Sequence, residues 1–202
     1  MLIHGNGEDH RLFEVEIRQL TEAGYEVIAP DSRGHGMNAP LAEYHYADMA
    51  EDMYQLILAL GLEKPALYGF SDGGIIGLLL EITHPGTLGI LAVSGANLSD
   101  RGLDPEWLAS IRKENEAYPE PLVTLMLTEP NIPPEALERI RIPVLVTAGE
   151  KDLILPEETE RIAAHLPNAQ KRILPGEDHG SYIHGSPVMG KLLLAFFREQ
   201  GY

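Results

Sequence analysis

The chain has 202 residues, which is enough for one domain with a sizeable hydrophobic core. It contains no cysteine, so disulfide bonds, thiolate metal sites and a cysteine nucleophile are excluded. Its formal net charge of -16 disfavours nucleic acid and anionic membranes as partners, because an acidic surface repels phosphate groups.

Short apolar runs alternate with helical patterns along most of the chain, which is typical of βαβ units with a parallel sheet. The expected strands are 1–4, 25–29, 66–70, 88–94, 143–148 and 170–174. The expected helices are 10–23, 43–60, 72–83, 157–165 and 187–199. The helix 43–60 has the clearest pattern, because its apolar residues recur at three- and four-residue steps and Gly61 closes it.

The alternation stops between residues 97 and 141, where prolines separate short helical pieces. We interpret this stretch as a small helical cap inserted in the core of a single domain, 1–202. Trp107 and Met126 in the cap are candidate walls of a substrate pocket. Packing of the cap on the core explains apolar residues of this kind equally well.

No segment resembles a signal for export or a membrane anchor. The first seven residues, MLIHGNG, lack the basic and apolar regions of a signal peptide. The longest apolar stretch, Ile75 to Leu80, contains a glycine and is much shorter than a membrane span. We therefore expect a cytoplasmic protein.

The segment Gly69-Phe70-Ser71-Asp72-Gly73 matches the pattern G-x-S-x-G between an expected strand and an expected helix. Glycines on either side of the serine permit a sharp, strained turn that larger side chains would block. The turn exposes the Ser71 hydroxyl and directs the helix N-terminus at a developing anion. In the alternative interpretation this is an ordinary glycine-rich turn, and Ser71 is only a helix N-cap.

A serine hydroxyl needs a neighbouring base to become an effective nucleophile. Functional groups of open α/β sheets collect at the carboxyl ends of strands, so the partners of Ser71 should follow later strands. Asp152 follows the strand 143–148 and His179 follows the strand 170–174. We predict that His179 accepts the Ser71 proton and that Asp152 orients the imidazole.

Other residues near these positions remain open alternatives. Glu150 or Asp178 could replace Asp152, and His184 is the nearest rival of His179. Each predicted partner, taken alone, could also be an ordinary residue of a solvated loop. The order Ser, Asp, His along the chain, with each residue at a strand end, favours the catalytic interpretation.

Anion stabilisation requires hydrogen-bond donors beside the nucleophile. The turn His4-Gly5-Asn6-Gly7 directly follows the first expected strand. We predict that the backbone N–H groups of Asn6 and Asp72 form an oxyanion hole. The alternative is a plain glycine turn without a catalytic role.

Together, HGNG, DSRGHG, GFSDGG, GEKDLILP and GEDH resemble the α/β-hydrolase superfamily over nearly the whole chain. S-D-G-G and S-G-A-N are similar to the biphenyl-hydrolase-like and valacyclovir-hydrolase-like esterases. The resemblance implies an α/β-hydrolase fold, with a mostly parallel sheet of about six strands flanked by helices. It implies structural roles for Arg33 and His35. It also places Asp72 where some relatives bind a substrate ammonium group, although an acid at a helix N-terminus needs no such role.

One departure concerns the start of the sheet. The family usually has two further strands before the HG turn, and here the sequence begins almost at that turn. Without them, the segment 25–29 (YEVIA) would form an exposed edge on which another chain could pair. We therefore expect either a monomer or a homodimer joined at this edge.

The expected activity is hydrolysis of a small or medium carboxylic ester, with an amino-acid ester or a lactone as further options. A perhydrolase or a C–C bond hydrolase would use the same triad, and a non-catalytic small-molecule receptor could share the fold. A metal-dependent hydrolase is disfavoured, because H-E-x-x-H is absent and the eight histidines are scattered. We expect no metal and no cofactor.

Overall fold

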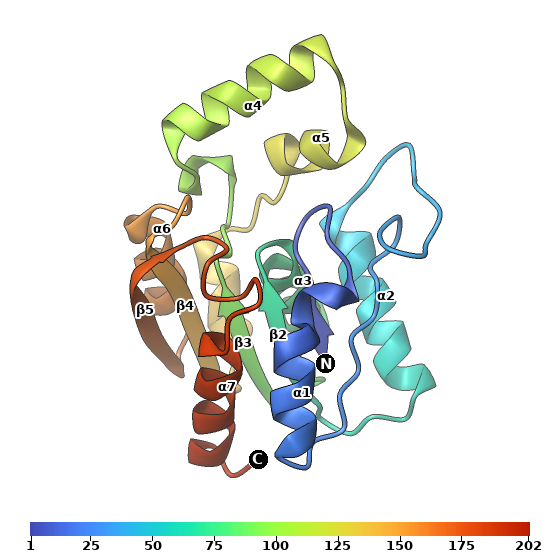
Figure 1. Cartoon of the computed structure of the whole chain (residues 1–202), viewed down its shortest axis with the longest axis vertical. Coiled ribbons are helices and arrows are strands. Elements are labelled where there is room, and N and C mark those ends of the chain that lie inside the picture. Colours follow the sequence, from blue (N-terminus) through green and yellow to red (C-terminus); the bar gives the residue numbers. More distant parts are fainter.

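Five parallel strands, in the order β1-β2-β3-β4-β5, form a sheet with helices on both faces (Figure 1). The computed structural model describes all residues from 1 to 202. The strands are β1 (Leu2–Ile3), β2 (Ala66–Phe70), β3 (Ile90–Ser94), β4 (Val144–Lys151) and β5 (Ala169–Asp178). The helices are α1 (Glu14–Glu22), α2 (Tyr46–Ala59), α3 (Asp72–Thr83), α4 (Pro105–Ala117), α5 (Pro121–Thr128), α6 (Pro156–His165) and α7 (Val188–Glu199), with short 3-10 helices η1 (His10–Phe13), η2 (Asp100–Gly102) and η3 (Pro134–Arg139). None of the helices has the length and apolar character needed to cross a bilayer.

Successive residues of the central strands face opposite helical layers, as the pleat of a strand requires. In β3, Leu91 and Val93 join the buried cluster that includes residues of α2, α3 and α6. Ile90 and Ala92 join the cluster that includes residues of α1 and α7. Because both faces are covered, the strands are nearly continuous apolar runs in the sequence.

The predicted fold class is confirmed, and most predicted helices lie within a few residues of the observed ones. The predicted strand 25–29 is wrong, because this segment makes no regular ladder. One backbone hydrogen bond, from Leu2 N–H to Ile28 C=O at 2.9 Å, joins it to β1. Its neighbour β1 has only two residues, so few ladder positions exist for it to pair with.

The helices α4 and α5 lie beyond the ends of the strands, above the sheet in Figure 1. They belong to the predicted cap, 97–141, whereas η3 at the end of that stretch packs against α3 and α6. Ile132 N–H donates to Leu98 C=O at 2.9 Å and joins the two ends of the cap. An antiparallel bridge between Leu103 and Ile154 fastens the cap to the loop after β4.

Glu16 is a buried acidic residue of α1 without a counter-charge. Its side chain has no exposed surface, and neither carboxylate oxygen has a hydrogen-bond partner. Burial raises the pKa of Glu16 from 4.5 to about 7, because the charged form is poorly solvated there. The folded state therefore retains a proton that the unfolded chain releases at lower pH.

This difference predicts how stability depends on pH. Between about pH 4.5 and 7 the unfolded chain binds fewer protons at Glu16 than the folded protein, so folding stability falls as pH rises. Glu16→Gln removes this loss, which amounts to at most about 3 kcal/mol. We expect the variant to gain more free energy of unfolding relative to wild type at pH 8 than at pH 5, measured by urea denaturation. An equal difference at the two pH values would contradict the assignment.

Candidate active site

Three of the parallel strands end directly before the predicted catalytic side chains. Ser71 follows β2, Asp152 follows β4 and His179 follows β5. Lys151 and Asp178 are paired in the register of β4 and β5, so the residues after them emerge side by side. The sheet thereby brings together side chains that lie up to 108 residues apart in the chain.

His179 lies between Ser71 and Asp152 and is within hydrogen-bonding distance of both. Its Nε2 is 3.1 Å from Ser71 Oγ, and its Nδ1 is 2.6 Å from Asp152 Oδ1. The Asp152 carboxylate also accepts hydrogen bonds from Gly149 N–H and Ile154 N–H, each at 3.0 Å. These donors hold the carboxylate in place, so it can orient the imidazole with Nε2 facing the hydroxyl.

The alternative residues do not occupy these positions. Glu150 accepts a hydrogen bond from Gly176 N–H, and Asp178 accepts from the backbone at Gly180 and Ser181. His184 Nε2 is 3.2 Å from Glu8 Oε1, and His184 forms no ion pair with Asp152. The structure thus brings together the three residues that were favoured from the sequence.

Ser71 has the strained backbone conformation that the G-x-S-x-G pattern predicts. Its φ of 53° and ψ of -116° lie in a region that L-residues rarely adopt. A side chain at Gly69 would place Cβ 2.0 Å from the carbonyl oxygen of Gly73. The glycine is therefore required by the close approach of strand and helix at this turn.

Gly95, directly after β3, makes room for the imidazole ring. A Cβ at this position would lie 2.7 Å from His179 Cε1, and the residue has a φ of 58°. The ring of His179 thus passes over the end of β3 on its way to Ser71. Nothing in the sequence pattern pointed to this role, because it depends on the register of three strands.

The turn that follows β1 lies beside the start of α3. The backbone N–H of Asn6 has no hydrogen-bond partner in the protein, and that of Asp72 is at the first residue of α3, where no helical acceptor exists. The Asn6 side chain donates to Asp72 Oδ2 at 2.9 Å and to Leu122 C=O of the cap at 3.2 Å. Asn6 and Asp72 both line the cavity beside Ser71, and their role as an oxyanion hole stays a prediction.

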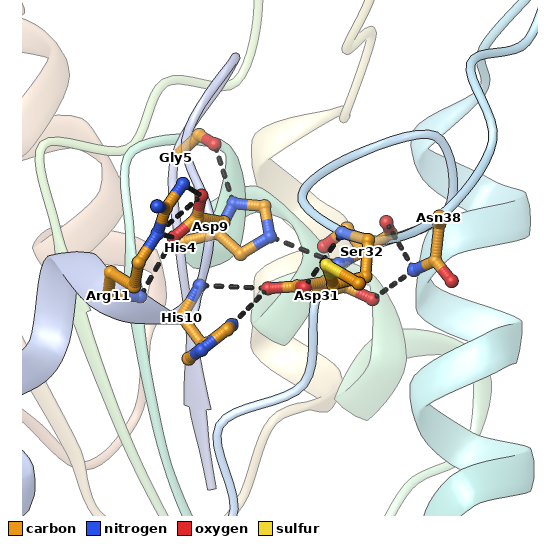
Figure 2. A network of polar contacts seen from close by, with 9 residues as sticks. His4, Gly5, Asp9, His10, Arg11, Asp31, Ser32 and Asn38 are labelled. Atoms are coloured by element: carbon orange, nitrogen blue, oxygen red, sulfur yellow. Dashed lines mark hydrogen bonds and ion pairs between the residues drawn. The ribbon is translucent and has the colours of Figure 1, made fainter.

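A polar network behind this turn holds it against the loop 31–38 (Figure 2). His4 Nδ1 is 2.8 Å from Gly5 C=O, and Ser32 N–H donates to His4 Nε2 at 3.0 Å. Burial lowers the pKa of His4, which favours the neutral ring that can donate at one nitrogen and accept at the other. Asp31 Oδ1 accepts from both the backbone and the ring of His10, at 2.9 and 2.7 Å.

Asp9, His10 and Asp31 are the residues of this network that could hold a metal ion, since one ligand atom of each lies within 4.8 Å of the others. Their side chains already have protein partners, because Asp9 pairs with Arg11 and Asp31 binds His10. None of the three lines the catalytic cavity. The hydrogen bonds among them suffice to explain the cluster as an anchor for the turn.

Arg33 and His35 lie outside the cavity beside Ser71. The family resemblance implied structural roles for both residues. The Arg33 guanidinium pairs with Asp52 at 2.6 Å and ties this loop to α2. The ring of His35 lies between those of His4 and Tyr44, with centroid distances of 5.1 and 5.9 Å.

A cavity of about 240 Å³ opens beside Ser71 and His179. Trp107 and Met126, the candidate walls in the cap, both line it. The lining residues that were missed from the sequence include Glu8, Tyr46 and Glu129. Tyr46 was assigned to the apolar face of a helix, and the two glutamates belong to no recognisable motif.

Asp72 is the most deeply buried carboxylate of the cavity, with 5% of its surface exposed. Its Oδ1 accepts a hydrogen bond from Tyr46 Oη at 2.8 Å, and its Oδ2 accepts from Asn6. Burial raises the pKa of Asp72 in spite of these neutral donors. A cationic group in the cavity would therefore find a partly desolvated carboxylate without a protein counter-ion.

Glu129 joins the cap to the N-terminus of α2. Its carboxylate contacts His45 Nδ1 at 2.7 Å and accepts a hydrogen bond from Tyr46 N–H at 3.0 Å. This contact raises the pKa of His45, because the charged ring interacts favourably with the carboxylate. The wall of the cavity formed by Tyr46 and the cap is thus fastened by polar contacts.

Comparison with known proteins agrees with this geometry. Residues 1–121 match a family model described as the alpha/beta hydrolase fold. RutD from Caulobacter sp. (strain K31), whose name describes a carbamate hydrolase, is 31% identical, covering 88% of this chain and 82% of the relative. The serine hydrolase BPHL from Homo sapiens is 26% identical, covering 96% of this chain and 76% of the relative.

Among solved structures, a thermophilic esterase from Thermogutta terrifontis is similar with a TM-score of 0.76. The similarity covers 98% of this chain and 89% of the esterase. At 21% sequence identity this likeness shows the fold.

Proposed function

The chain belongs to the alpha/beta hydrolase fold family and is a hydrolase, and we propose that it cleaves a small or medium carboxylic ester through attack by Ser71. One observation carries this proposal: His179 contacts Ser71 Oγ with one ring nitrogen and the buried Asp152 carboxylate with the other. This is the arrangement that activates a serine hydroxyl at neutral pH.

In the first half of the proposed reaction, Ser71 Oγ attacks the ester carbonyl while His179 Nε2 takes its proton. The negative charge that develops on the carbonyl oxygen is stabilised by the N–H groups of Asn6 and Asp72. Collapse of this intermediate breaks the bond to the alcohol, which receives the proton from His179. Asp152 stabilises the imidazolium that exists between these steps.

In the second half, a water molecule attacks the acyl group on Ser71. His179 Nε2 takes a proton from the water and returns it to Ser71 Oγ as the acid departs. The groups that act in this half are the same as in the first, so the same geometry serves both.

The surroundings of the nucleophile favour a neutral or cationic ester. The net charge of -16 and the carboxylates of Glu8, Asp72 and Glu129 on the cavity repel anionic substrates. An amino-acid ester would complement Asp72. The ammonium group of the ester would supply a positive charge, whereas Tyr46 and Asn6 are neutral donors. In the alternative role, Asp72 only stabilises the N-terminus of α3.

Removal of the nucleophile or the base tests the mechanism. Ser71→Ala and His179→Ala should each lower kcat on a p-nitrophenyl ester by a factor on the order of 10⁵–10⁶, because the triad acts as a unit. Ser110→Ala, on the exposed surface of α4, is the matched control and should retain wild-type turnover. Near-wild-type turnover in either triad variant, with the fold intact by circular dichroism, would exclude that residue.

Asp72→Asn separates the two roles of this carboxylate. The substrates are the p-nitrophenyl esters of alanine and of isobutyric acid, in which a methyl group replaces the ammonium. If Asp72 binds the ammonium, the substitution should lower kcat/KM for the alanine ester about tenfold more than for the isobutyrate. Equal losses on both esters would favour the role at the helix N-terminus.

A further inference from the structure

Glu8 is a carboxylate that lines the catalytic cavity, and the proposed mechanism gives it no role. Its side chain is 22% exposed and lines the cavity together with Ser71 and His179. Its Oε2 accepts a hydrogen bond from Gly5 N–H at 2.9 Å, and its Oε1 is 3.2 Å from His184 Nε2. These two contacts hold the carboxylate at a defined place.

That place is beside the nucleophile. A Cβ at Gly5 would lie 2.7 Å from Glu8 Oε2 and 3.2 Å from Ser71 Cβ, so one small group would touch both residues. A substrate group that extends from Ser71 past Gly5 would therefore lie beside the Glu8 carboxylate.

Glu8 and the expected path of the departing alcohol both lie toward the loop after β5. The departing alcohol receives its proton from His179, so it lies on the side of the cavity next to the loop after β5. Glu8 contacts His184 of that same loop, and the charges of His184 and His179 both act on its carboxyl group. Asp72 contacts Tyr46 of α2 and the side chain of Asn6 and has no contact with the loop after β5, although its charge also acts on the carboxyl group of Glu8.

The Glu8 carboxylate has capacity for a further partner. A carboxylate can accept about four hydrogen bonds, and the protein supplies one hydrogen bond, from Gly5 N–H, and one ion-pair contact, with His184. Burial raises the pKa of Glu8, because it disfavours the charged form of the carboxyl group. No lysine or arginine lines the cavity to neutralise it.

We propose that Glu8 binds a cationic group on the alcohol portion of the substrate, so that esters of short amino alcohols are preferred. This inference rests on the proposed ester hydrolysis and adds the chemical class of the alcohol that leaves. The chemistry is unchanged, because the protonated amino alcohol departs with the proton from His179 and the acid is released by water.

The test compares acetylcholine with 3,3-dimethylbutyl acetate, which has the same shape but a carbon in place of the charged nitrogen. Wild type should show about fivefold higher kcat/KM on the choline ester, the upper end of the range expected of one partly exposed ion pair. Glu8→Gln should abolish this preference, since the amide still accepts from Gly5 N–H but carries no charge. Glu22→Gln is the matched control, because it removes one charge from an exposed position of α1 and should keep the preference.

A wild-type enzyme that hydrolyses both esters without preference, or a Glu8→Gln variant that retains it, would overturn the assignment of Glu8 and leave the ester hydrolase intact. Absence of Ser71-dependent hydrolysis of p-nitrophenyl acetate would instead remove the proposed function and this inference with it. If Glu8→Gln fails to fold, the wild type is tested by inhibition instead. Choline should inhibit p-nitrophenyl acetate hydrolysis about fivefold more strongly than 3,3-dimethylbutan-1-ol. Equal inhibition by the two alcohols would count against Glu8.

Discussion

The contact between His179 Nε2 and Ser71 Oγ is the interaction on which the function of this site depends. A hydroxyl at its ordinary pKa is a poor nucleophile, and only a base within hydrogen-bonding reach changes that. The parallel sheet brings His179 within reach of Ser71, because β2, β4 and β5 end at the same edge in a fixed register. The buried Asp152 carboxylate, held by two backbone N–H groups, orients the imidazole, and turning the ring away would break both of its contacts.

Close packing at the carboxyl edge is the second constraint. Gly69 and Gly95 have neighbours so near that a side chain would displace either the helix after the nucleophile or the ring of His179. The turn that carries Asn6 is anchored from behind by His4 and from above by Leu122 of the cap. The donors expected to stabilise the oxyanion are thus positioned before substrate arrives, which is the condition under which such donors are most effective.

Much of this arrangement could be predicted from the sequence, because the signals are local. The helix α2 follows from the periodicity of its apolar residues, and Ser71 follows from a pattern whose glycines have a steric reason. Asp152 and His179 could be placed because each lies a few residues after an expected strand and directly after an observed one. Apolar residues of the cap, such as Trp107, could be proposed as pocket walls on composition alone.

What could not be predicted depends on contacts between distant segments. The segment 25–29 has the composition of a strand, but strand formation requires a partner of sufficient length, and β1 is too short. The Tyr46 hydroxyl reaches Asp72 only because α2 packs beside α3. Glu8 belongs to no motif, and its place beside Ser71 is visible only once the turn after β1 is folded against β2.

The central claim is that Ser71 is a nucleophile made reactive by His179, and covalent labelling measures this most directly. The protein is incubated with a fluorophosphonate, and the modified peptide is identified by mass spectrometry in wild type and in His179→Ala. The account predicts one phosphonyl group per chain, located on Ser71, and much slower labelling in the variant. Modification of another residue, or labelling of Ser71 at an equal rate without the imidazole, would contradict it.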